Sequence, residues 1–144
     1  MSAGAALVLS HVGLSAPTAR AWLRARLGPG GFVALHSTVS TLALAAFIYT
    51  FARADPGPQI LIPSLATRWA VVALMPLAVF GALARLSTRA RAGDALLPPA
   101  GIYRITRAPG NLAILLWTLL HMANTGDARR LAAFALMALI ALSS

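Results

Sequence analysis

The 144-residue chain has no cysteine and no lysine, and acidic side chains are scarce. Without cysteine, disulfides, thiolate metal sites and thiol nucleophiles are excluded. Only 10% of the residues are charged, against roughly 25% in an average soluble domain. This shortage of charge argues against a soluble globular protein.

Apolar residues are abundant in the chain, and arginine is its main charged residue. Hydrophobic residues are 59% of the sequence, and the mean hydropathy is +0.78. The 12 basic residues, all arginine, outnumber the 3 acidic ones and give a net charge of +9. Because the arginines lie between apolar runs and not in one patch, we interpret them as topology signals and lipid headgroup contacts. The expected partner is therefore the lipid bilayer and not a nucleic acid.

Five apolar runs predict an all-α, polytopic transmembrane bundle of about five helices, some of them short or kinked. The first run reaches spanning length only if its helix continues through Pro17 to Trp22 with a kink. Pro76 interrupts the third run, and Gly28-Pro29-Gly30-Gly31 predicts a loop over residues 24–31. The predicted spans are residues 2–22, 32–52, 66–86, 111–124 with an extension to about 129, and 131–142.

The chain is expected to form one membrane domain over residues 1–144. Its last apolar run is short, so this run either lies partly in the interface, packs against deeper helices, or has lost a C-terminal piece. The loops after the first and third predicted spans, together with Arg20 and Arg85 at the ends of those spans, carry eight of the 12 arginines. The positive-inside rule therefore places those loops in the cytoplasm and the N-terminus in the periplasm.

His11 and His121 are the first candidates for a chemical role, because ionisable side chains inside a membrane span are functional candidates by default. In the predicted spans both lie near the bilayer midplane. Two neutral imidazoles at equal depth on neighbouring helices can hold a haem iron from opposite faces. The iron would then have six ligands, so that a small molecule could bind only if one histidine left. His11 is the easier one to exchange, given the kink at Pro17.

The helix faces around these two histidines support the same hypothesis. His121 shares its face with Ile114, Trp117 and Thr118, an apolar wall suited to a flat macrocycle. His11 shares its face with three small or apolar residues, namely Gly4, Leu7 and Val8. The competing interpretation is that each histidine only forms an interhelical hydrogen bond, for His121 to the carbonyl that Pro76 leaves unpaired.

The remaining candidates are His36 and two arginines. His36 is predicted to be a headgroup-level side chain beside Ser37 and Ser40, and not a third ligand. Arg104 and Arg107 are either topology signals or clamps for an anion, such as a haem propionate or a phosphate.

The segment Gly101 to Asp127, GIYRITRAPGNLAILLWTLLHMANTGD, resembles the signature of the NnrU family. That signature has a basic Arg-x-Pro turn, a helix bearing Trp and His, and a short Asn/Gly/Asp turn. The N-terminal half is similar as well, in Ser10-His11, in the glycines after Leu27 and in the serines that open the next span. The similarity covers approximately residues 6–136.

The resemblance implies a bacterial inner-membrane protein linked to denitrification, that is, to nitrite and nitric oxide metabolism. A relative, the plant 15-cis-zeta-carotene isomerase, is a haem b membrane enzyme that isomerises a carotene double bond. His11 and His121 correspond to family histidines, which implies haem b as cofactor and nitric oxide or a small apolar molecule as substrate. Any activity would then be that of a haem-dependent isomerase or redox protein. Ala108 departs from the family, which usually has histidine there.

Two other interpretations stay open. Membrane methyltransferases that resemble isoprenylcysteine carboxyl methyltransferase use a similar turn to hold S-adenosylmethionine. The residues that match their pattern are Gly101, Tyr103, Arg104, Arg107 and Pro109. Ala108 does not match, and no acidic residue follows Asp127. The small size of the chain also fits a non-enzymatic accessory subunit of a larger membrane complex.

Overall fold

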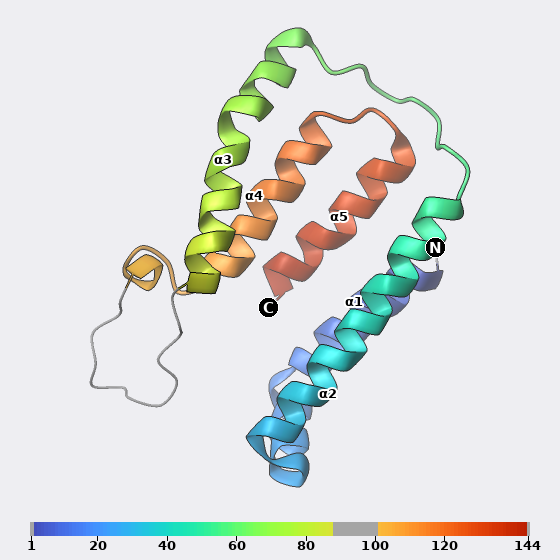
Figure 1. The fold of residues 1–144 in the computed structure, drawn as a ribbon. Coiled ribbons are helices and arrows are strands. Elements are labelled where there is room, and N and C mark those ends of the chain that lie inside the picture. The colour runs from blue at the N-terminus through green and yellow to red at the C-terminus, as the bar shows by residue number, and fades with distance from the viewer. Residues whose placement is uncertain (1, 88–100, 144) are drawn as a thin grey trace. The chain divides into compact units, whose positions relative to one another are not determined.

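The computed structural model describes residues 2–87 and 101–143, and in these ranges it contains helices and no β-strand (Figure 1). The predicted all-α class with about five helices is confirmed. The helices are α1 (Ser2–Ser15), α2 (Pro17–Arg53), α3 (Leu65–Ser87), the short 3₁₀ helix η1 (Gly101–Arg104), α4 (Pro109–Ala123) and α5 (Ala128–Ser143). Part of the predicted polar connection lies outside the described residues, namely Arg89, Arg91, Asp94, Pro98 and Pro99.

The chain divides into two compact units. The first comprises residues 1–56 with the last two residues, and the second comprises residues 57–142. In the first unit α1 packs along α2, and in the second α3 packs along α4. His11 and His36 belong to the first unit, whereas His121, Arg104 and Arg107 belong to the second.

The first predicted span is not one continuous helix. Ala16 has an extended backbone (ψ 133°), so α1 ends at Ser15 and Pro17 opens α2. Proline suits that first helical position because its missing N–H would have no partner there in any case. With 14 residues, α1 extends only about 21 Å. The expected kink at Pro17 is thus a full break between two helices.

The predicted loop at residues 24–31 is mostly helical as well. Only Gly28 leaves the helical conformation, with a φ of 71° that favours glycine. Pro29 then starts the next helical segment under the same rule as Pro17. A single residue therefore makes the turn that the sequence predicted over eight.

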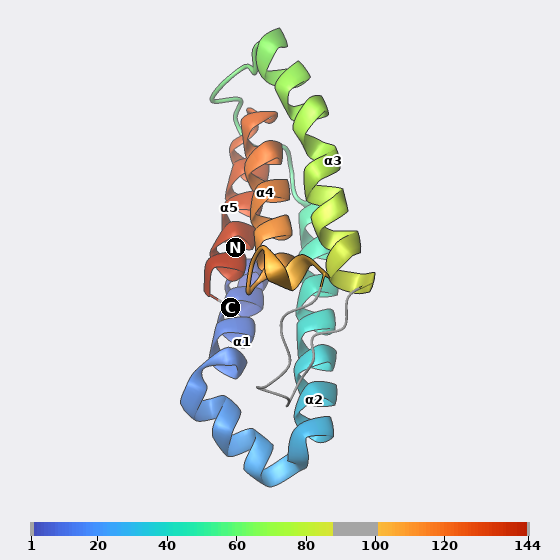
Figure 2. The ribbon, with the colours of Figure 1, turned by 90° about the vertical axis from the view of Figure 1, so that its left-hand side faces the viewer.

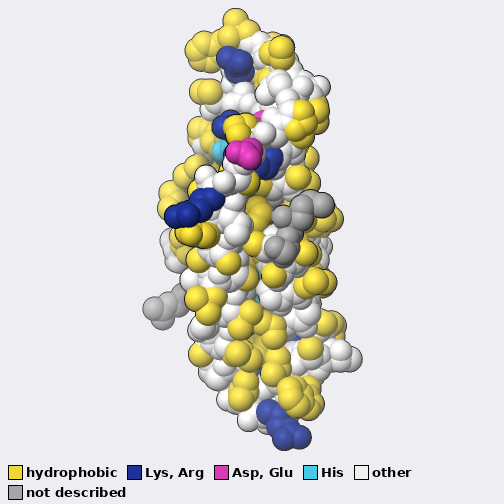
Figure 3. Space-filling view, turned by 90° about the vertical axis from the view of Figure 1, so that its right-hand side faces the viewer, with side chains coloured by type: hydrophobic (Ala, Val, Ile, Leu, Met, Phe, Trp, Pro, Cys, Tyr) yellow, Lys and Arg dark blue, Asp and Glu magenta, His cyan; other side chains and the backbone are white. Residues whose placement is uncertain are grey.

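Among residues 2–87 and 101–143, two helices are long and apolar enough to cross a bilayer, α2 with 37 residues and α3 with 23. In their most apolar windows only 6% and 11% of the residues are buried. Large apolar side chains such as Trp22, Ile48 and Trp69 are exposed, and apolar side chains predominate on the face in Figure 3. Such surfaces are stable in lipid and costly in water, which supports a membrane protein.

The core of the second unit depends on small residues. A methyl group placed on Gly81 of α3 would lie 3.2 Å from the Cβ of Ala113 on α4, so the two helices approach closely. Ala78, Ala138 and Ala141 are also buried. Small residues at contacts are typical of helices that associate in membranes, where close backbone packing is the main attraction. Figures 1 and 2 show α4 between α3 and α5.

An extended segment, residues 57–63, crosses the turn between α4 and α5; we call it the strap. The Ile60 N–H donates to the Gly126 carbonyl at 2.8 Å, and the Ala128 N–H donates to the Pro58 carbonyl at 3.0 Å. A Cβ on Gly126 would overlap the Leu61 carbonyl oxygen and the Gln59 side-chain nitrogen. The strap can therefore lie on this turn only because residue 126 is glycine.

Asp127 starts α5 as its N-cap. Its Oδ1 accepts the N–H groups of Arg129 at 2.8 Å and Arg130 at 3.1 Å. Desolvation alone would raise the pKa of Asp127, but these hydrogen bonds and the two guanidinium charges outweigh it and lower the pKa. Because this capped turn follows Ala123, the predicted extension of the fourth span to about residue 129 is wrong.

Replacing Gly126 by alanine is expected to destabilise the second unit. The added methyl group must displace the strap, and such overpacking costs about 1–3 kcal/mol. The thermal midpoint of the purified protein in detergent, followed by circular dichroism, should fall clearly. Gly110→Ala is the matched control, because its methyl group would meet only the flexible Arg85 side chain at 3.5 Å. Equal midpoints for both variants would contradict the steric role of Gly126.

Asp127→Ala should lower the thermal midpoint, whereas Asp127→Asn should largely keep it, because asparagine also accepts the two N–H groups. The folded state lowers the pKa of Asp127 below its ordinary value of 3.8. Its contribution is therefore complete above that value and is lost as the pH falls through the folded-state pKa. Melting curves of the wild type and Asp127→Asn between pH 7 and pH 3 test this. The wild type should lose more stability on acidification than the asparagine variant.

Candidate functional site

His121 lies in the last turn of α4, within a cluster of three aromatic rings. Its ring centre is 4.3 Å from that of Trp117 and 4.8 Å from that of Phe134, which comes from α5. Trp117 and Phe134 also contact each other edge to face, at 5.4 Å. The predicted apolar wall is thus confirmed at Trp117. Thr118 is fully buried and bonds the Leu115 carbonyl, while Ile114 is exposed.

The hydrogen bond of His121 fixes which nitrogen carries the proton. Nδ1 lies 2.8 Å from the carbonyl oxygen of Trp117. A carbonyl only accepts, so Nδ1 must be the donor, and in the neutral imidazole Nε2 then carries the lone pair. Metal-binding histidines are commonly oriented by such a bond from their other nitrogen. The predicted hydrogen bond from His121 to the carbonyl freed by Pro76 is wrong for Nδ1, because Nδ1 bonds the Trp117 carbonyl one turn earlier on α4.

His11 lies near the end of α1 and contacts His36 of α2. The two ring centres are 5.2 Å apart, with the rings inclined by 62°. His36 also packs on the buried Phe32, at 5.7 Å. His36, which the sequence predicted only as a headgroup-level side chain, therefore forms half of a histidine pair. Gly4 and Leu7, on the predicted His11 face, are buried.

Arg104 and Arg107 stand at the other end of α4 from His121. Arg104 ends η1, Arg107 precedes Pro109, and both side chains are exposed. Pro109 and His121 are twelve positions apart along α4, which corresponds to about 18 Å. The structure does not bring these arginines together with His121, and their role as anion clamps stays a prediction. Ala108 occupies the N-cap position of α4 and provides no side-chain cap.

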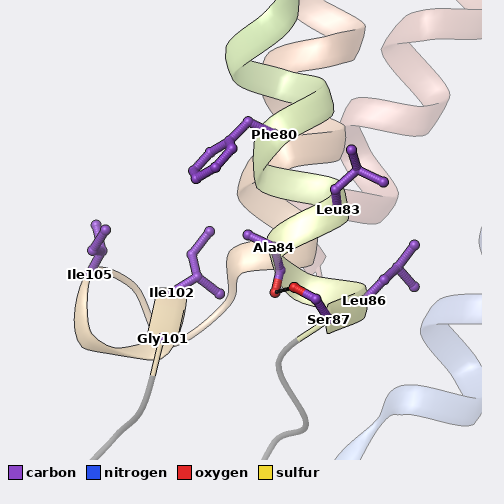
Figure 4. A pocket seen from close by; sticks show the side chains of 8 residues that line it. All are labelled: Phe80, Leu83, Ala84, Leu86, Ser87, Gly101, Ile102 and Ile105. Atoms are coloured by element: carbon purple, nitrogen blue, oxygen red, sulfur yellow. Dashed lines mark hydrogen bonds between the residues drawn. The ribbon is translucent and has the colours of Figure 1, made fainter.

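An apolar groove lies beside η1 in the second unit (Figure 4). It has a volume of about 910 Å³. Phe80 and Ala84 of α3 lie on the side of Ile102 and Ile105, and Leu83 also lines the groove. The groove is lined almost entirely by apolar atoms and holds none of the candidate ligands, so it adds lipid-compatible surface and no chemistry.

Together, the exposed apolar helices and the ordered His121 define a helical membrane protein with a candidate ligand histidine in an aromatic setting. Comparison with protein families matches residues 1–144, the whole chain, to the family described as NnrU protein. The chain belongs to the NnrU family. No match was found among curated proteins or among solved structures.

The sequence analysis did not predict two ring contacts of the histidines, that of Phe134 with His121 and that of Phe32 with His36. Phe134 follows His121 by thirteen residues across a turn, and only the antiparallel return of α5 brings their rings together. Phe32, His36 and Ser40 have the four-residue spacing that places side chains on one helix face, so this signal was present. The contact of that face with His11 needed the sharp turn at Gly28.

The tautomer of His121 is directly testable. In protein with ¹⁵N-labelled histidine, NMR at pH 8 should show Nδ1 protonated and Nε2 unprotonated for this residue. The resonance is assigned by its loss in His121→Ala. Trp117→Phe, which keeps the backbone carbonyl, should leave the tautomer unchanged. A protonated Nε2 in the wild type would contradict the geometry.

Proposed function

We propose that this NnrU protein binds haem b in the bacterial inner membrane, where His121 and His11 would hold the iron, and acts in nitrite or nitric oxide metabolism. The ordered ring of His121 is the observation that carries the proposal. The sequence predicted both histidines at equal depth in two long spans. The structure places them near the ends of short helices, so their depth does not support haem binding. We keep the N-terminus in the periplasm, as the arginine distribution indicates.

The residues around His121 fit a haem ligand in three ways. The bond from Nδ1 to Trp117 presents a lone pair on Nε2. Trp117 and Phe134 both pack against the His121 ring and restrict its rotation. The apolar rings of Trp117 and Phe134 also provide a surface on which a flat macrocycle can pack.

The protein itself orients the His121 ring and shields it from water. The hydrogen bond from Nδ1 to the Trp117 carbonyl holds the direction of the His121 ring, while the aromatic side chains limit access of water. Bound haem would supply one-electron redox chemistry and a binding position for small molecules. An isomerase activity toward an apolar polyene is the second candidate reaction that family resemblance implies, and the exposed apolar helices would let such a substrate approach from the lipid.

The absorption spectrum of protein purified after expression with haem supplied tests this proposal. We expect a Soret band in the wild type that is lost or clearly shifted in His121→Ala and in His11→Ala. His36→Ala is the control and should keep the band. The absence of a Soret band from folded wild-type protein would refute haem binding, as would a band unaltered in both the His11 and His121 variants.

A further inference from the structure

The first unit contains polar atoms for which its helices provide no partner. Nδ1 of His36 and Oγ of Ser40 are shielded from solvent and form no hydrogen bond within the described residues. Ser40 follows His36 by one helical turn, so both lie on the α2 face that meets His11. Unsatisfied polar atoms in an apolar setting are costly and call for an explanation, such as a bound ion.

The chemistry of the pair restricts what that ligand can be. The first unit has no acidic residue before Asp55, and the chain has no cysteine. Neutral imidazole nitrogens are therefore the strongest electron-pair donors that this unit offers to a metal ion. Imidazole prefers first-row transition metals such as zinc, copper, iron and nickel. Anions find no cationic partner in the pair itself, and hard cations prefer oxygen ligands.

The spacing of the rings agrees with a shared ion. Two imidazoles on one tetrahedral metal, with bonds of about 2.0 Å, have ring centres about 5 Å apart. Imidazoles on opposite sides of one metal would be separated by about 6 Å. The observed 5.2 Å fits the bent arrangement and not the opposed one. His36 therefore does not complete an opposed pair with His11 around haem iron.

We infer that His11 and His36 form a binding site for a transition-metal ion such as Zn²⁺, with Ser40 beside them as a hydrogen-bond partner for a further ligand. Two protein ligands leave the remaining coordination positions to water or another small ligand. This site shares His11 with the proposed haem site but does not depend on it, because His36 takes no part in haem binding and His121 takes no part in this pair.

Titration of the haem-free protein with Zn²⁺ alone, in detergent and followed by calorimetry, tests the site. We expect one ion per chain, and His11→Ala and His36→Ala should each weaken binding at least about tenfold. Ser40→Ala should also weaken it by about tenfold, as is typical for groups that support a metal ligand, whereas the exposed Ser37 provides the neutral control Ser37→Ala. His121→Ala should bind as the wild type does.

His36→Gln guards against loss of the fold, since its amide fills similar space but is a poor ligand for zinc. Circular dichroism and gel filtration establish that each variant is folded. Wild-type affinity in folded His36→Gln, or no Zn²⁺ binding by the folded wild type, would overturn the inference. The haem proposal fails differently, through a missing Soret band while Zn²⁺ binding persists. His36→Ala should lose Zn²⁺ and keep the Soret band, and His121→Ala should do the reverse.

Discussion

The crossing of the strap over the turn between α4 and α5 determines the arrangement of the second unit. Backbone hydrogen bonds join the strap to this turn at Gly126 and at Ala128. Gly57 makes a similar close approach, since a Cβ there would lie 2.7 Å from the Arg129 backbone nitrogen. Two positions without side chains thus allow two chain segments to meet. The direction of α5, and with it the placement of Phe134 against His121, depends on this contact.

Membrane surroundings explain why such a contact matters. Inside lipid there is little hydrophobic gain from bringing helices together, so close packing and hydrogen bonds must hold them. The second unit accordingly uses Gly81 and Ala113 between α3 and α4, and backbone bonds at the strap. The signature turn Asn124 to Asp127 is therefore structural: Gly126 admits the strap and Asp127 caps α5.

The sequence predicted the class and the number of helices because length and hydropathy determine both. Helix ends were harder, since Pro17 and Pro29 can either break a helix or begin one, and only the conformation of the preceding residue decides. His121 and Trp117 were predicted as neighbours because they are one turn apart on the same helix. The His11 and His36 contact depends on how α1 folds back along α2, which local spacing does not encode.

The hydrogen bond of His121 lies wholly within its own helix. Its acceptor is the carbonyl one turn earlier, so the ring direction is set as soon as α4 forms. Little conformational entropy then remains to be lost when a ligand arrives, and the ordering cost has already been met by helix formation. The hydrogen bond that orients His121 thus requires the formation of α4 alone and not the docking of the other helices.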